Sequence, residues 1–219
     1  MVKQLISSGA TIPFLVSLYK QDSYVEKVVY GKQKAQIGTF LQRAVLTGIS
    51  VGALGIALNN FIAMTPLVEV STGFQTANDN FFAGGILLEI LASCVVVPIA
   101  EEILFRGIVL KRASAMAGAG MGILCSALLF GIVHMNLVQF IYATLLGALL
   151  AVIVAKTKQV SLAVIGHAFA NLIAILRAET GVLEFAYEPD VAGIGFSVVV
   201  LVLGVGMAGM LVKICEEDS

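Results

Sequence analysis

Charged residues are scarce in this chain. Its 219 residues are 59% hydrophobic and 12% charged, whereas a soluble domain has roughly a quarter of its residues charged. This scarcity excludes a soluble globular protein and predicts an integral membrane protein, and the length suits one compact helical bundle. The formal net charge of -1 gives no electrostatic reason to expect a nucleic-acid partner.

Cysteine is also rare, with Cys94, Cys125 and Cys215 scattered along the chain. Their spacing fits neither a metal site nor an evident disulfide framework. We expect all three to be small buried hydrophobic residues.

Long apolar runs dominate what remains. A membrane-spanning helix needs about 20 mostly apolar residues, which predicts an all-α polytopic bundle of about six spans around an interior polar cavity. The expected spans are Phe40–Met64, Phe81–Val109, Ala119–His134, Leu137–Ala155, Val160–Ile175 and Val191–Ile214. The shorter run Leu5–Leu18, interrupted by Pro13, is expected at the membrane interface or against the bundle, and Tyr19–Thr39 as a cytoplasmic linker or amphipathic segment.

Basic residues mark every second connection between these expected spans. They are Lys3, Lys20, Lys27, Lys32, Lys34, Arg43, Lys111, Arg112, Lys156, Lys158 and Lys213. This alternation follows the positive-inside rule for six spans with both termini in the cytoplasm. Only Arg177, in the expected loop after the fifth span, falls on the wrong side.

Two adjacent acids, Glu101 and Glu102, lie within the second apolar run. Ionisable groups inside a membrane cost several kcal/mol and are by default candidates for function. Glu102 has a cation four residues later, Arg106, which predicts an ion pair on one helix face. Glu101 is rotated about 100° from Glu102 and has no cation at helical spacing, so it suits a general base.

Both histidines of the chain also lie in apolar runs. His167 and Asn171 are four residues apart, as are Phe130 and His134, so each pair shares a helix face. Counted from the nearest basic residue, Glu101 and His167 both lie roughly 15 Å deep. His134 comes out deeper, and we expect its helix to be short or tilted and to end inside the protein.

These three ordered motifs, Glu101-Glu102-x-x-x-Arg106, Phe130-x-x-x-His134 and His167-x-x-x-Asn171, resemble the CPBP/Abi family of intramembrane glutamic proteases. That family includes CAAX prenyl endopeptidases of the Ras-converting type and bacteriocin-processing or immunity proteins. The resemblance covers roughly residues 81–175, and Gly107 and Leu146-Gly147 also look like the family pattern.

The resemblance implies a peptidase in which Glu101 and His134 activate a water molecule. His167 and Asn171 would bind the developing oxyanion or orient that water, and Glu102 and Arg106 would support the site. Expected substrates are prenylated CaaX C-termini or bacterial leader and signal peptides. We expect no cofactor, no nucleic-acid partner and a bacterial or archaeal plasma membrane as the location.

Three other interpretations stay open. A zinc protease could use Glu101, His134 and His167 as ligands, although no His-Glu-x-x-His motif is present. Intramembrane acids and histidines also occur in proton-coupled transporters. The third is an immunity or scaffold protein that keeps the fold without the activity.

The motifs suggest four regions along the chain. Residues 1–39 are an interfacial or cytoplasmic segment, and 40–80 hold the first span and an outer loop. Residues 81–177 form the catalytic core, and 178–219 hold an outer loop, the last span and a cytoplasmic tail.

Overall fold

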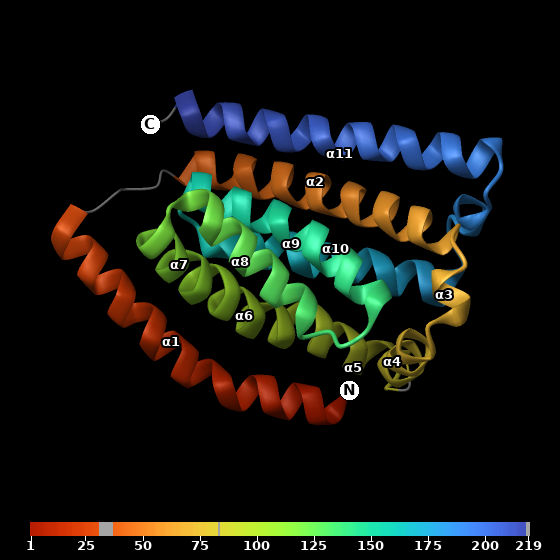
Figure 1. Ribbon diagram of the computed structural model, residues 1–219, viewed down its shortest axis with the longest axis horizontal. Coiled ribbons are helices and arrows are strands. Elements are labelled where there is room, and N and C mark those ends of the chain that lie inside the picture. Colours follow the sequence, from red (N-terminus) through yellow and green to blue (C-terminus); the bar gives the residue numbers. More distant parts are fainter. Residues whose placement is uncertain (31–36, 83, 218–219) are drawn as a thin grey trace.

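A computed structural model describes residues 1–30, 37–82 and 84–217, and these form a helical bundle (Figure 1). The elements in chain order are α1 (Val2–Tyr30), α2 (Ile37–Ala63), α3 (Leu67–Val70), α4 (Thr72–Phe82), α5 (Ile86–Ile90), the π-helical η1 (Leu91–Val96), α6 (Val97–Glu102), the π-helical η2 (Ile103–Val109), α7 (Leu110–Ala117), α8 (Ala119–Ile132), α9 (Leu137–Thr157), α10 (Val160–Thr180), the 3₁₀ turn η3 (Glu184–Tyr187) and α11 (Val191–Glu217). No strand occurs in the described ranges, so the predicted all-α class is confirmed.

Helices α2, α9, α10 and α11 form the centre and one edge of the bundle, and α1 forms the opposite edge (Figure 1). The core residues between α2, α9, α10 and α11 include Val51, Leu150, Leu162 and Leu211, each at most 1% exposed. We call the end of the bundle that holds the C-terminus of α11 the basic end, because α7, α9 and α11 place Lys111, Lys156 and Lys213 there. The other end, with α3, α4 and η3, is the acidic end.

Four of the expected spans have the length and apolar character to cross a membrane. They are Thr39–Ala63, Leu137–Thr157, Val160–Thr180 and Val191–Glu216. The second expected span begins later than predicted, because Gly85 adopts a positive φ of 78° that separates α4 from the long helix Ile86–Ala117. That helix comprises α5, η1, α6, η2 and α7 in succession.

The third expected span is short. Helix α8 has 14 residues, about 21 Å of length, which is less than a hydrocarbon core requires. It follows α7 directly through Gly118, whose φ of 86° suits glycine and reverses the chain. The prediction of a short helix is confirmed, but the prediction that it ends inside the protein is wrong, because Ile132 and Val133 at its end are each 53% exposed.

The N-terminal segment differs from its prediction. Instead of a short interfacial run and a linker, α1 continues through Pro13 to Tyr30 and lies along α6 and η2. Leu15 packs with Ala100 and Ile108, and Arg112 of α7 donates to Asp22 at 2.9 and 3.1 Å. Residues 31–36 of the predicted linker lie outside the described part of the chain.

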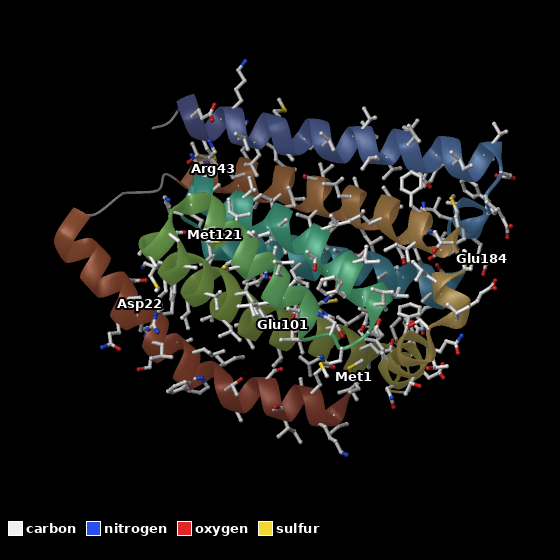
Figure 2. All side chains as sticks on the ribbon, in the orientation of Figure 1. Met1, Asp22, Arg43, Glu101, Met121 and Glu184 are labelled. Carbon is white, nitrogen blue, oxygen red and sulfur yellow. The ribbon has the colours of Figure 1, made fainter. Side chains whose placement is uncertain are left out.

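This course of α1 places the two ends of the chain apart. A Cβ added to Gly84 would lie 3.3 Å from the Met1 side chain, so Met1 lies at the acidic end, whereas α11 ends at the basic end (Figure 2). Helix α1 is not among the helices that are long and apolar enough to cross a membrane. The prediction that both termini lie in the cytoplasm therefore stays a prediction.

Close approach between α2 and α11 gives a test of the packing. A Cβ added to Gly204 would lie 2.7 Å from Leu54 Cγ and 3.0 Å from Leu54 N. Because backbone cannot yield as a flexible side chain does, Gly204→Ala should push the helices apart and lower the free energy of unfolding by about 1–3 kcal/mol. Thermal unfolding in detergent measures this loss.

Gly206→Ala is the matched control, since nothing lies within 4 Å of a Cβ there. It should leave the melting temperature unchanged or slightly raised, because alanine favours helix more than glycine. Equal effects of the two substitutions would contradict the packing described here.

Candidate active site

Glu102 is the most completely enclosed acid of the predicted site. Arg106 Nη1 donates to Glu102 Oε1 at 3.1 Å, and neither side chain is exposed. His167 Nδ1 donates to the same oxygen at 2.8 Å. The predicted ion pair is therefore present, and a histidine from α10 completes a buried triad of Glu102, Arg106 and His167.

Arg106 extends this triad to two further helices. Its Nη2 donates to the carbonyl oxygen of Gly147 on α9 at 2.9 Å, and its guanidinium lies 4.4 Å from the ring centroid of Phe130 on α8. A Cβ on residue 147 would lie 2.8 Å from Nη2, so glycine lets the backbone of α9 approach. The sequence marked Gly147 only through the family pattern and missed its role as a hydrogen-bond acceptor.

Glu101, on the same helix turn, has a different environment. Its side chain is 24% exposed, and Oε2 lies 3.8 Å from His167 Nε2, too far for a direct hydrogen bond. The Glu101 carboxylate accepts no hydrogen bond from any described residue. Because Glu102 accepts a hydrogen bond from Nδ1 of His167, the imidazole is turned so that Nε2 faces Glu101.

His134 is held by the backbone at the end of α8. Its Nδ1 lies 2.8 Å from the carbonyl oxygen of Phe130. A carbonyl can only accept, so Nδ1 carries the proton and the neutral ring keeps Nε2 as an acceptor. Asn136 fixes the turn that follows, because its Oδ1 caps α9 at Gln139 N and its Nδ2 donates to His134 O.

Phe130 lies between the two histidines. Its ring centroid is 5.1 Å from that of His134 and 5.6 Å from that of His167, edge to face in both cases. Phe130 itself is 3% exposed. The structure thus brings His134 and His167 against one buried aromatic ring, and Glu101 lies beside His167.

Asn171 lies one turn after His167 and contacts the backbone instead of an acid. Its Nδ2 donates to the carbonyl oxygen of Ser93 in η1 at 2.7 Å. A comparable bond joins α8 to the same long helix, where Ser126 Oγ donates to Phe105 O in η2 at 2.9 Å. Asn171 therefore fastens α10 to η1 in this structure, and its catalytic role stays a prediction.

Arg177, the exception to the charge pattern, is not a loop residue. It belongs to the last turn of α10, is 4% exposed, and donates from Nη2 to Asn60 Oδ1 at 2.8 Å. An arginine buried inside the protein does not count toward the charge of a loop, which explains the exception. Glu89, left out of the predicted site, is also fully buried, on α5.

No group of three or more His, Cys, Asp or Glu side chains in the described ranges is arranged to hold a metal ion. In particular, His167 directs Nδ1 to Glu102. The described residues therefore provide no set of zinc ligands in this geometry. Whether the protein binds zinc stays open.

Residues 83–173 match the family model described as "Type II CAAX prenyl endopeptidase Rce1-like". This matched segment contains Glu101, Glu102, Arg106, His134, His167 and Asn171. The central segment of the chain is therefore similar to the CPBP/CAAX protease family. The resemblance based on the three motifs is thereby confirmed.

A curated relative from Bacillus subtilis (strain 168), named "Putative membrane peptidase YdiL", is 32% identical over 89 residues. The match covers 41% of this chain and 36% of that relative. No solved structure matches the chain.

The buried triad predicts a strong dependence on Arg106. Arg106→Met would leave Glu102 without its cation inside the protein, and breaking a buried pair from one side costs about 3–5 kcal/mol. We expect the free energy of unfolding to fall by that amount in thermal or chemical unfolding.

The double variant Glu102→Gln/Arg106→Met should recover part of the loss, since no uncompensated charge remains. Arg112→Met is the control, because the Arg112 side chain is 53% exposed and its loss should change stability little. If the Arg106→Met protein is as stable as the wild type, the buried triad does not contribute to the free energy of unfolding as predicted.

Proposed function

We propose that this protein is an intramembrane endopeptidase in which the Glu101 carboxylate activates a water molecule for attack on a peptide bond. The observation that carries the proposal is the contrast between the adjacent acids. Glu102 is enclosed and paired with Arg106, whereas Glu101 is partly exposed, accepts no hydrogen bond from the described residues and faces a histidine. The family match supports a membrane peptidase.

In the proposed reaction, Glu101 takes a proton from water while the water oxygen bonds to the carbonyl carbon of the substrate. His134 Nε2, left as an acceptor by the Phe130 bond, accepts a hydrogen bond from the same water and orients it. The C–N bond of the tetrahedral intermediate then breaks, and the proton held by Glu101 passes to the leaving amine. The products are a carboxylate-terminated peptide and a free amine.

The oxyanion of that intermediate needs hydrogen-bond donors. Asn171 uses one N–H on Ser93 O and keeps the other for the oxyanion, and His167, whose Nε2 faces Glu101, orients the attacking water. Donors in a water-poor site of this kind are typically worth about 3–4 kcal/mol each to the transition state. No metal ion is part of this mechanism.

The substrate classes that we propose are prenylated CaaX C-termini and bacterial leader or signal peptides. Both present an extended peptide next to an apolar anchor or segment, which suits a site enclosed by apolar helices. We propose a bacterial or archaeal plasma membrane, with the basic end of the bundle in the cytoplasm, because basic residues prefer that side. A water molecule and a peptide must then reach Glu101 from an aqueous opening, because hydrocarbon admits neither.

Cleavage assays on the detergent-solubilised protein test the role of Glu101. With a farnesylated CaaX peptide and candidate leader peptides as substrates, Glu101→Gln and His134→Ala should each lower kcat by about 10²–10⁴-fold, the usual contribution of a positioned base. Melting temperatures should stay near that of the wild type, since neither side chain makes a hydrogen bond to another helix.

Glu89→Gln is the matched control, because Glu89 is another acid of the same long helix and is fully buried. It should keep the cleavage rate. A Glu101→Gln protein that cleaves at the wild-type rate would refute the glutamate mechanism, and a cellular phenotype that survives both Glu101→Gln and His134→Ala would favour a transporter, immunity or scaffold role.

Metal content separates the proposed mechanism from the zinc alternative. Elemental analysis of the purified protein should find no stoichiometric zinc, and treatment with EDTA should leave the cleavage rate unchanged. Zinc at one ion per chain, with activity lost on chelation and restored by zinc, would establish the alternative.

A further inference from the structure

The turn between α8 and α9 exposes four apolar side chains around a candidate catalytic residue. Ile132, Val133 and Leu137 are 53%, 53% and 55% exposed, and Met135 is 87% exposed. His134 lies between them in the chain and is half-buried. We call Ile132, Val133, Met135 and Leu137 the apolar turn.

Polar surface borders the apolar turn. The turn lies at the acidic end of the bundle, close to α4 (Figure 1), where a Cβ added to Gly73 would come within 3.3 Å of Asn136 Cβ. Helix α4 exposes Gln75, Asp79 and Asn80. Exposed apolar side chains next to polar residues are typical of an interaction site.

The backbone holds Met135 in an unfavourable conformation. Its φ of 60° is uncommon for residues other than glycine, and a large apolar side chain adopts it less readily than asparagine does. Hydrogen bonds fix the turn on both sides, because Met135 N donates to Ile132 O at 3.1 Å and Asn136 Nδ2 donates to His134 O at 3.1 Å. Backbone strain of this kind is concentrated at functional sites, so a methionine at this position needs a reason beyond the turn itself.

Met135 directly follows His134, whose imidazole we place at the attacking water. The carbonyl oxygen of Phe130 holds Nδ1 of that ring at 2.8 Å, which leaves Nε2 for the water. Successive Cα atoms of a peptide are about 3.8 Å apart, so the substrate residues on either side of the attacked bond lie close to His134 and to its neighbours in the chain. Met135 is the most exposed of these neighbours.

We propose that Met135 is a specificity-determining residue, which binds an apolar side chain of the substrate next to the cleaved bond. This inference rests on the proposed function and adds the part of the chain that selects the peptide. Methionine suits the task because its unbranched thioether side chain adapts to apolar groups of different shape. The removal of both side chains from water stabilises the complex.

Cleavage kinetics with paired peptides test the assignment. The farnesylated CaaX peptide and the leader peptides are each made with leucine or with asparagine next to the cleaved bond. Met135→Asn should raise KM for the leucine peptide about five- to tenfold and leave kcat unchanged, because it removes binding that is equal in the ground state and the transition state. KM for the asparagine peptide should not rise, so the preference for leucine should fall by the same factor.

Met116→Asn is the matched control, since Met116 of α7 is 88% exposed and lies at the basic end. It should leave the kinetics of both peptides as in the wild type. The melting temperature of Met135→Asn should not fall, because asparagine tolerates the positive φ better than methionine. An unchanged KM for the leucine peptide, or an equal rise for both peptides, would overturn the proposal.

Photo-crosslinking separates a failure of this inference from a failure of the proposed function. In the Glu101→Gln protein, which should bind peptide without cleaving it, benzoylphenylalanine in place of Met135 should crosslink to the leucine peptide, and benzoylphenylalanine in place of Met116 should not. Crosslinking at position 135 without cleavage by the wild type would refute the peptidase and keep the peptide contact. Cleavage by the wild type without crosslinking at position 135 would refute the role of Met135 alone, and the absence of both would overturn both proposals.

Discussion

The carboxylate of Glu102 is the point on which the arrangement of the functional helices depends. One oxygen of this acid receives Arg106 from the next turn and His167 from α10. Arg106 then reaches the backbone of α9 and the ring of Phe130 on α8. One ion pair without solvent exposure thus connects the long helix Ile86–Ala117 with α8, α9 and α10.

This constraint explains why two adjacent acids have unlike environments. Because Glu102 neutralises Arg106 and orients His167, Glu101 is left with space on one side and an imidazole nitrogen on the other. A helix rotates its side chains by about 100° per residue, so one turn can present a structural acid and a reactive acid to different surroundings. The Phe130 ring lies 5.1 Å from the ring of His134 and 5.6 Å from that of His167, so it contacts both histidines.

Much of this arrangement could be predicted from the sequence because it rests on spacing along single helices. The pairs Glu102–Arg106 and Phe130–His134 are four residues apart, and their contacts follow from helix geometry alone. The match between His167 and Glu102 requires the packing of two helices, and the sequence suggested it only through depth. The hydrogen bond from Arg106 to Gly147 O could not be predicted, because a backbone acceptor leaves no mark in the side-chain pattern.

The course of α1 and the role of Arg177 also depend on contacts between helices that the sequence pattern does not predict. The polar residues of α1 masked a helix that packs on α6 through Leu15, and Pro13 suggested a break that tertiary contacts override. The sequence suggested that Arg177 lies in a loop, because neither of its partners is nearby on the same helix. Asn60 is distant in sequence, and Tyr187 follows the turn after α10. Hydropathy reports where a segment can lie, but not which neighbours will satisfy its polar atoms.

The two π-helical segments have a consequence for how this protein can change. They flank α6, and each provides a backbone carbonyl that accepts a hydrogen bond from another helix. Ser93 O accepts from α10, which carries His167, and Phe105 O accepts from α8, which ends two residues before His134. Removing one residue from either segment would rotate the rest of the helix by about 100°, so that the carbonyl oxygens of Ser93 and Phe105 would no longer both face their donors. The spacing between residues 91 and 109 is therefore less tolerant of insertion or deletion than of substitution, a restriction on length that no single side chain reveals.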